Sequence, residues 1–198
     1  MPQGLISSTK GGGRITTLFA ISTVALALTS CTSGTPGGSA TNKSTPLVRP
    51  SSAAPTTPVS PVDQAKQAAL AAYRGMWRDF VVAGTTSDWQ SASLGQYATG
   101  IALTNMSRGL YADHYNGLVT KGEPVLSPSV SSVDPLTDPK KTIITDRGDS
   151  TQWLKYRADN GKLADTPGGR RLINAIVEKQ ADGSWKVTDF GVHNVGTC

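Results

Sequence analysis

The sequence predicts an α+β domain in which N-terminal helices pack on a strongly curved antiparallel sheet. Three observations lead to this fold class. Apolar residues recur at three- and four-residue spacing between Ala65 and Val81, which is the pattern of a helix with one buried face. From residue 118 onward the pattern changes to short β-type runs separated by turn residues. The last run, 184–195, breaks its own alternation once, as a bending strand does.

Residues 1–30 have the character of an export signal. A polar, basic stretch with Lys10 and Arg14 is followed by the run 15–28, which is apolar apart from scattered Thr and Ser. This run is too short for a stable membrane-spanning helix, which needs about 20 apolar residues. We therefore expect a cleaved signal peptide, and a true membrane anchor is the alternative.

The four residues Leu28-Thr29-Ser30-Cys31 resemble a bacterial lipobox, in which an aliphatic and two small residues precede the cysteine that receives lipid. The resemblance implies that Cys31 is acylated and holds the protein on the extracytoplasmic face of the cell membrane. Cys198 would then be a lone thiol, either free or bridged to another molecule. A Cys31–Cys198 disulfide in a protein without lipid is the alternative.

Residues 31–61 consist mainly of Ser, Thr, Pro, Gly and Ala, with no aromatic residue. Such a segment cannot bury enough apolar surface to offset its chain entropy, so we expect a disordered linker. Its prolines favour an extended spacer between the membrane and the domain 62–198: Pro46, Pro50, Pro55, Pro58 and Pro61.

The domain is expected to open with a helix that begins near Ser60-Pro61-Val62-Asp63 and ends at Gly84. Its expected buried face comprises Ala65, Ala68, Ala69, Ala72, Tyr73, Met76, Trp77, Phe80 and Val81. Its expected solvent side comprises Lys66, Gln67, Arg74, Arg78 and Asp79.

Two more helical stretches are expected before Gly117. Ser87-Asp88 can cap a short helix with Trp89 near its start. Helical spacing continues in two groups, Leu94, Tyr97, Ala98 and Ile101, then Leu103, Met106, Leu110 and Tyr111.

The expected strands in chain order are 119–133, which prolines break at 124 and 128, then 141–146, 151–157, 171–179 and 184–195. Turn residues separate them at 135–139 and 159–161. The last two strands form a hairpin that turns at Asp182-Gly183. A single bulge near Asp189-Phe190 would bring four large residues to one face: Trp185, Val187, Phe190 and Val192.

This order of elements resembles the NTF2-like, or SnoaL-like, cone fold. The resemblance rests on the helix face 73–80, the segment 94–101 and the hairpin run 181–187, Ala-Asp-Gly-Ser-Trp-Lys-Val. It implies a pocket between the sheet and the long helix. Such domains include isomerases, cyclases, dehydratases and members without known catalysis, so the fold does not imply a function. With the lipobox and linker, the chain resembles small secreted lipoproteins of Gram-positive actinobacteria.

The formal net charge of +5 comes mostly from outside the domain. Removing Lys10 and Arg14 leaves +3, and removing Lys43 and Arg49 from the linker leaves +1. No basic face remains to neutralise a phosphate backbone, so nucleic acid is not an expected partner.

An enzyme in such a pocket would need groups that donate and accept protons. The candidate catalytic residues are His114 beside Asp113, His193 with Asp189 or Asp146, and Asp146 near Asp149. A structural or exposed role is the alternative for each histidine, since neighbours on a helix point in different directions. Asp146 has turn capping as its alternative.

Neither a metal nor a cofactor is expected, because two histidines without a cysteine pair give no zinc-type ligand spacing. The Arg-Gly-Asp run 147–149 is explained by a turn. Gly168-Gly169-Arg170-Arg171 could approach an anion, although a hairpin loop is the simpler interpretation. Four tryptophans are expected in the core, Trp77, Trp89, Trp153 and Trp185.

The leading hypothesis is a lipid-anchored extracytoplasmic protein that binds a small hydrophobic ligand or another envelope protein without catalysis. The alternative is a SnoaL-like enzyme that uses a pocket Asp and His for acid–base chemistry. A third possibility is a homodimer formed through the sheet, which Cys198 could crosslink.

Overall fold

A computed structural model of the chain describes residues 58–198. The expected signal peptide, Cys31 and most of the linker lie outside the described residues. The helices are α1 (Pro61–Gly84), α2 (Leu94–Tyr97) and α3 (Gly100–Tyr115). The strands are β1 (Leu118–Lys121), β2 (Ser129–Asp134), β3 (Lys141–Asp149), β4 (Leu154–Arg157), β5 (Arg170–Lys179) and β6 (Trp185–Val192).

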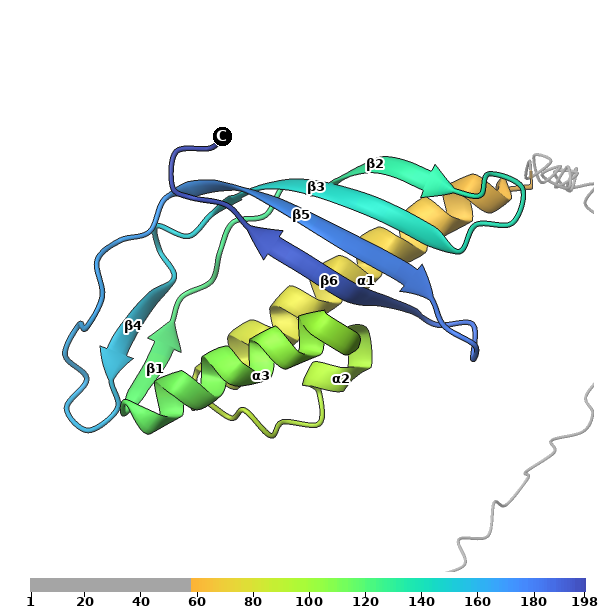
Figure 1. Cartoon of the computed structure of the whole chain (residues 1–198). Coiled ribbons are helices and arrows are strands. Elements are labelled where there is room, and N and C mark those ends of the chain that lie inside the picture. Colours follow the sequence, from red (N-terminus) through yellow and green to blue (C-terminus); the bar gives the residue numbers. More distant parts are fainter. Residues whose placement is uncertain (1–57) are drawn as a thin grey trace, which may run out of the picture. The chain divides into compact units, whose positions relative to one another are not determined.

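The strands form two antiparallel sheets. Four of them lie in the order β2-β3-β5-β6, and β1 pairs with β4 in a separate small sheet. The helices cover one face of the four-stranded sheet, and the β1–β4 pair lies at one end of the domain (Figure 1). This arrangement confirms the predicted α+β fold class, in which N-terminal helices pack on an antiparallel sheet.

The bulge expected in the last strand is present. Ile176 pairs with Asp189 and Val177 pairs with Val187, so Thr188 is the extra residue between them. The shift brings Val187 and Phe190 to the same face, where Val187 is buried and Phe190 packs against the core. Such a bulge increases the local twist of a sheet.

Helix α1 begins and ends as predicted. The Ser60 hydroxyl accepts a hydrogen bond from the Asp63 N–H at 3.1 Å, which satisfies a donor of the first turn. The placement of Asp79 was wrong, because its side chain is buried rather than on the solvent side. Arg78 accounts for this, since its guanidinium donates to Asp79 Oδ1 at 3.0 Å and pairs with the charge.

The second predicted helix was placed too early. Ser87 has a positive φ of 53° and its hydroxyl donates to the Leu118 carbonyl, so it joins a turn to β1 instead of capping a helix. The helix α2 follows a turn and begins at Leu94. The further helix predicted to close near Gly117 is α3, which is confirmed.

The predicted strand 119–133 is two strands that belong to different sheets. β1 pairs with β4, whereas β2 pairs with β3, and the chain crosses between the sheets at the predicted proline breaks. Between β1 and β2, Val125 forms an isolated antiparallel bridge with Asp149 at the end of β3. This pairing explains why β3 continues to Asp149, three residues beyond the predicted end.

The core lies between α1, α3 and the inner face of β3, β5 and β6. Its members are Ala69, Ala72, Tyr73, Met76, Trp77, Ala83, Leu94, Ala98, Ala102, Met106, Leu110, Ile144, Ile173, Ala175, Val177 and Val187. Each large apolar member contributes about 1.5–3 kcal/mol by leaving water. Of the predicted core tryptophans only Trp77 is buried, while Trp89, Trp153 and Trp185 are partly buried against the core.

Two helical glycines should respond oppositely to alanine. A Cβ at Gly75 would lie 2.6 Å from the Tyr97 ring, so Gly75→Ala should destabilise the domain by about 1–3 kcal/mol through overpacking. A Cβ at Gly109 would meet nothing within 4 Å, so Gly109→Ala should stabilise it by about 0.5–1 kcal/mol. Urea unfolding measures both changes, and effects of the same sign would contradict this packing.

Candidate functional site

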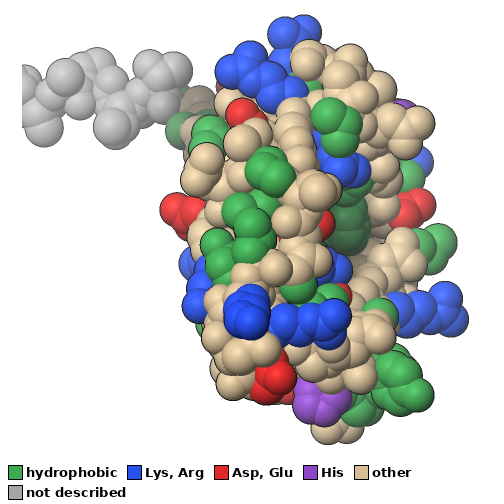
Figure 2. Space-filling model, turned by 90° about the vertical axis from the view of Figure 1, so that its left-hand side faces the viewer, with side chains coloured by type: hydrophobic (Ala, Val, Ile, Leu, Met, Phe, Trp, Pro, Cys, Tyr) green, Lys and Arg blue, Asp and Glu red, His purple; other side chains and the backbone are tan. Residues whose placement is uncertain are grey.

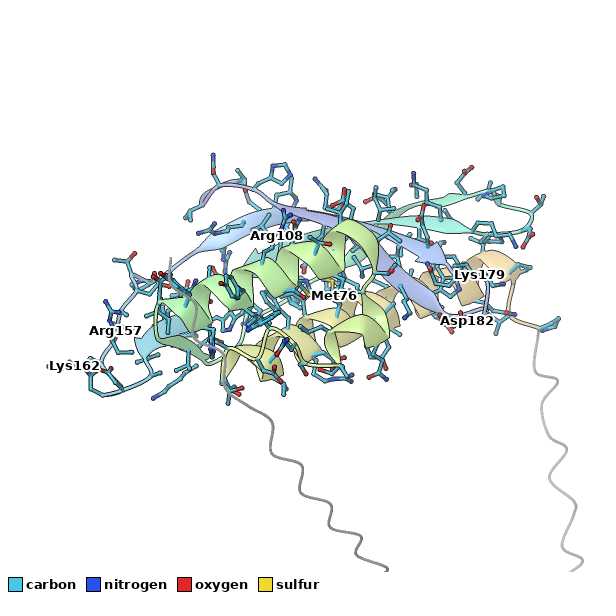
Figure 3. The ribbon with its side chains drawn as sticks, turned by 60° about the horizontal axis from the view of Figure 1, so that its bottom comes forward. Met76, Arg108, Arg157, Lys162, Lys179 and Asp182 are labelled. Carbon is cyan, nitrogen blue, oxygen red and sulfur yellow. The ribbon has the colours of Figure 1, made fainter. Side chains whose placement is uncertain are left out.

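A cavity of about 550 Å³ opens at the end of the domain formed by β1 and β4. Its walls come from α1, α3, the ends of β3, β5 and β6, and the loop between β4 and β5. In Figure 2, which faces this end, hydrophobic side chains lie recessed between rims that carry Lys and Arg. Figure 3 labels Arg157 and Lys162 at this end, and Lys179 and Asp182 at the opposite end.

One wall of the cavity is aromatic and centres on Trp77. Its ring lies 6.0 Å from that of Phe80 and 5.8 Å from that of Trp153, measured between centroids. Phe190 lies at 5.8 Å from Trp77, in an edge-to-face arrangement. Helical spacing places Trp77 and Phe80 side by side on α1, and the β6 bulge turns Phe190 toward them. The wall offers rigid apolar surface to a ligand.

The cavity lining also contains an ion pair. Lys155 Nζ of β4 donates to Asp113 Oδ1 of α3 at 2.5 Å, and both residues line the cavity. The Asp113 side chain is 11% exposed and that of Lys155 is 41% exposed. A carboxylate this deep needs such a partner, because an unpaired buried charge is costly.

Four cavity residues carry buried polar atoms that have no hydrogen-bond partner among the described residues. They are the Thr120 hydroxyl, the Nε of Arg171, and the indole Nε1 atoms of Trp77 and Trp153. Thr120 lies so close to the end of α1 that a Cβ on Gly84 would be 2.3 Å from its Oγ1. Gly84 therefore allows β1 to pack directly against α1.

Asp146 does not line this cavity. It is fully buried on the inner face of β3, where Oδ2 accepts a hydrogen bond from the Tyr73 hydroxyl at 2.9 Å. Oδ1 accepts a second one from the Ser127 N–H at 2.6 Å. Burial raises the pKa of Tyr73 well above its ordinary value, and the nearby Asp146 charge and hydrogen bond raise it further. Asp146 thus joins β3, α1 and the segment before β2.

The structure does not bring the three candidate catalytic residues together. His114 is exposed on α3, while its neighbour Asp113 points into the cavity. His193 is exposed just beyond β6, with Nε2 2.9 Å from Asn174 Nδ2. Within residues 58–198, no group of three or more His, Cys, Asp or Glu side chains is placed to hold a metal ion.

The Arg-Gly-Asp run has a structural explanation. Asp149 accepts hydrogen bonds from the Thr151 N–H at 2.9 Å and from the Thr151 hydroxyl at 2.5 Å, which lower its pKa. Gly148 faces the interior and lines the cavity. The run therefore ends β3 and starts the turn to β4.

Sequence reasoning missed Lys155 and the aromatic wall as site residues. Lys155 lies in a predicted strand, but nothing in its neighbours indicates a contact with α3. The wall had a detectable signal, because three of its members, Trp77, Phe80 and Phe190, belong to the predicted faces of the first helix and the last strand. Asp113 was considered in the sequence only as the residue beside the candidate His114, and not as a cavity residue in its own right.

No helix within residues 58–198 combines the length and apolar character that crossing a membrane requires.

No family model matches this chain, and no curated protein is similar to it. Among solved structures it is similar to the intermembrane space region of the chloroplast protein ARC6, with 18% identity and a TM-score of 0.47. That match covers 65% of this chain and 96% of the other.

A second similar structure comes from Catenulispora acidiphila, with 15% identity, a TM-score of 0.44, and coverage of 64% and 92% of the two chains. The third is a ketosteroid isomerase-like protein from Erwinia carotovora atroseptica, with 10% identity, a TM-score of 0.38, and coverage of 65% and 94%. Similarity this low says nothing about what the chain binds.

Tyr73→Phe should make stability less dependent on alkaline pH. Because the pKa of Tyr73 is raised in the folded chain, the unfolded chain releases this proton first, near the ordinary value of 10.0. The wild type therefore loses stability as pH rises past 10.0, by about 1.4 kcal/mol per pH unit more than the variant.

Urea unfolding of both proteins between about pH 8 and about pH 11 measures this difference in slope. At the lower pH, Tyr73→Phe should already be less stable by about 1–3 kcal/mol, since Asp146 loses a buried donor. Tyr111→Phe is the control, because Tyr111 is 51% exposed. Equal slopes for wild type and Tyr73→Phe would contradict the assignment.

Proposed function

We propose that this chain is a lipid-anchored protein of the extracytoplasmic face of the cell membrane, whose domain binds a small, largely apolar molecule without catalysis. The observation that carries the binding function is the aromatic-walled cavity at the β1–β4 end. Its volume of about 550 Å³ lies within the range of ligand pockets, about 300–1,000 Å³.

The chemistry of the cavity supports an apolar ligand. Trp77, Phe80, Trp153 and Phe190 form one wall, and the polar pair Asp113–Lys155 is internally neutralised. Apolar surface that leaves water on binding contributes about 25 cal/mol per Å², so a ligand covering these rings gains affinity without further polar contacts. A few polar groups then suffice to orient it.

The proposal leaves out catalysis because of where the titratable groups lie. General acid–base chemistry needs groups within hydrogen-bond reach of the bound molecule. Neither His114, His193 nor Asp146 is among the cavity residues in the described part of the chain. The SnoaL-like enzyme alternative therefore lacks the His that it requires in this cavity, and the carboxylate of Asp113 is already paired with Lys155.

The anchor is supported by the sequence alone. The lipobox-like residues Leu28-Thr29-Ser30-Cys31 follow a short apolar run, and the linker that follows could hold the domain away from the lipid surface. An origin in actinobacteria, an envelope protein as partner and a homodimer crosslinked through the exposed Cys198 stay predictions.

The anchor is tested by the intact mass of the protein extracted from membranes of its host. We expect the wild type to begin at Cys31 with added acyl mass, and Cys31→Ala to lose both the lipid and the membrane retention. A released wild type in which Cys31 and Cys198 form a disulfide would disprove the lipid anchor.

The ligand site is tested by filling the cavity from α3. Gly109 lines the cavity, and a Cβ there meets nothing within 4 Å, so Gly109→Leu should occupy the space without disturbing the fold. The neutral dye N-phenyl-1-naphthylamine should brighten on binding to the wild type, and its affinity should fall about tenfold or more in the variant.

Asn105→Leu is the matched control, because it adds the same side chain to an exposed position of α3 outside the cavity. It should bind the dye as the wild type does. Dye binding that Gly109→Leu leaves unchanged would show that the cavity is not the binding site.

A further inference from the structure

Arg171 is the charged group of the cavity that has no partner. The alternation of β5 places Arg171, Ile173, Ala175 and Val177 on the inner face of the sheet. The last three are buried in the core, whereas Arg171 lies at the end of the row, where the inner face reaches the cavity. Its Nε is buried without an acceptor, and its guanidinium makes no ion pair within residues 58–198.

The acidic groups nearby are engaged or exposed. Asp113 pairs with Lys155, and Asp149 is held by Thr151 and lies 3.6 Å from Arg170, on the other side of the strand. Asp165 belongs to the exposed loop at the rim. Because Lys155 is paired with Asp113 and Asp165 is exposed to solvent, Arg171 is the one partly buried charge of the cavity without an ion-pair partner among the described residues.

The surroundings of Arg171 leave it open to a ligand. Its register partner on β3 is Gly148, so no side chain lies directly opposite on that strand. Gly168, which precedes β5 and lines the cavity, brings no side chain to it, and a Cβ there would lie 2.2 Å from Ser150 Oγ. A guanidinium offers a planar fork of N–H donors, which matches the two oxygens of a carboxylate.

We propose that the cavity binds an amphipathic monocarboxylate, whose carboxylate pairs with Arg171 and whose apolar part lies against Trp77, Trp153 and Phe190. This inference rests on the proposed ligand-binding function. Charge balance favours a single negative charge, because one unpaired cation is present and a dianion would leave a charge without a partner in a partly buried site. The ligand would also satisfy the Nε of Arg171.

Three compounds that differ only in their head group test the proposal: 4-phenylbutanoate, 4-phenylbutanol and 4-phenylbutylamine. Each competes with N-phenyl-1-naphthylamine for the full-length protein near neutral pH. The wild type should bind the carboxylate about tenfold or more tightly than the alcohol, since a charge-assisted pair adds to the same apolar contact. The amine should bind most weakly.

Arg171→Met should bring the affinity for the carboxylate down to that for the alcohol, and should change the affinity for the alcohol by about twofold or less. Arg171→Lys keeps the charge without the fork and should retain part of the preference. Arg170→Met is the matched control, because Arg170 precedes it on β5, faces the other way and has a 75% exposed side chain. Thermal melts check that each variant is folded.

The outcomes separate this inference from the proposed function. Equal affinity of the wild type for carboxylate and alcohol, or a preference that survives Arg171→Met, would overturn the role of Arg171 and leave the apolar cavity as the binding site. Tighter binding of 4-phenylbutyl phosphate than of the carboxylate would overturn the choice of a monoanion. Failure of the dye and of every compound to bind would overturn both proposals.

Discussion

The packing of Trp77 is the constraint on which the rest of the structure depends. Its ring contacts Tyr73, Phe80, Trp153 and Phe190, with centroid separations between 5.8 and 6.4 Å. One side chain therefore belongs both to the core between α1 and the sheet and to the wall of the cavity. Because the core holds it in place, the wall is preformed, and a ligand would not have to pay for ordering it.

The bulge at Thr188 connects the course of one strand with the shape of the site. In strict alternation from Val187, the ring of Phe190 would face away from α1, and Trp77 would lose one of its neighbours. The extra residue reverses the phase, so that the same strand supplies Val187 to the core and Phe190 to the cavity. The curvature of the sheet and the aromatic wall thus share one local cause.

Local signals were enough to predict α1, α3, the final hairpin and its bulge, because periodicity, capping and turn residues lie within a few positions of each element. One error is local: Asp79 is polar but buried, and its ion-pair partner is the adjacent Arg78. The other errors concern pairings between distant residues, as where β1 separates from β2 because its partner comes later in the chain. The prediction of the site failed for the same reason, because Asp113 and Lys155 are 42 positions apart in the sequence and contact each other only in the folded chain. Arg171 lay in a run already considered for anion binding, but only the fold shows that it faces a cavity.

The C-terminal segment borders the cavity. Val192 and Val195 line it, and a Cβ on Gly169 would lie 2.8 Å from Val195 Cγ1, so this segment packs on the start of β5. An affinity tag or reporter fused after Cys198 would be attached three positions beyond Val195, a residue that lines the cavity. The turn at Asp182-Gly183, at the opposite end of the domain in Figure 3, is the better place for a label. The site lies at the open end of the hairpin formed by β5 and β6, so a label belongs at the turn on its other end.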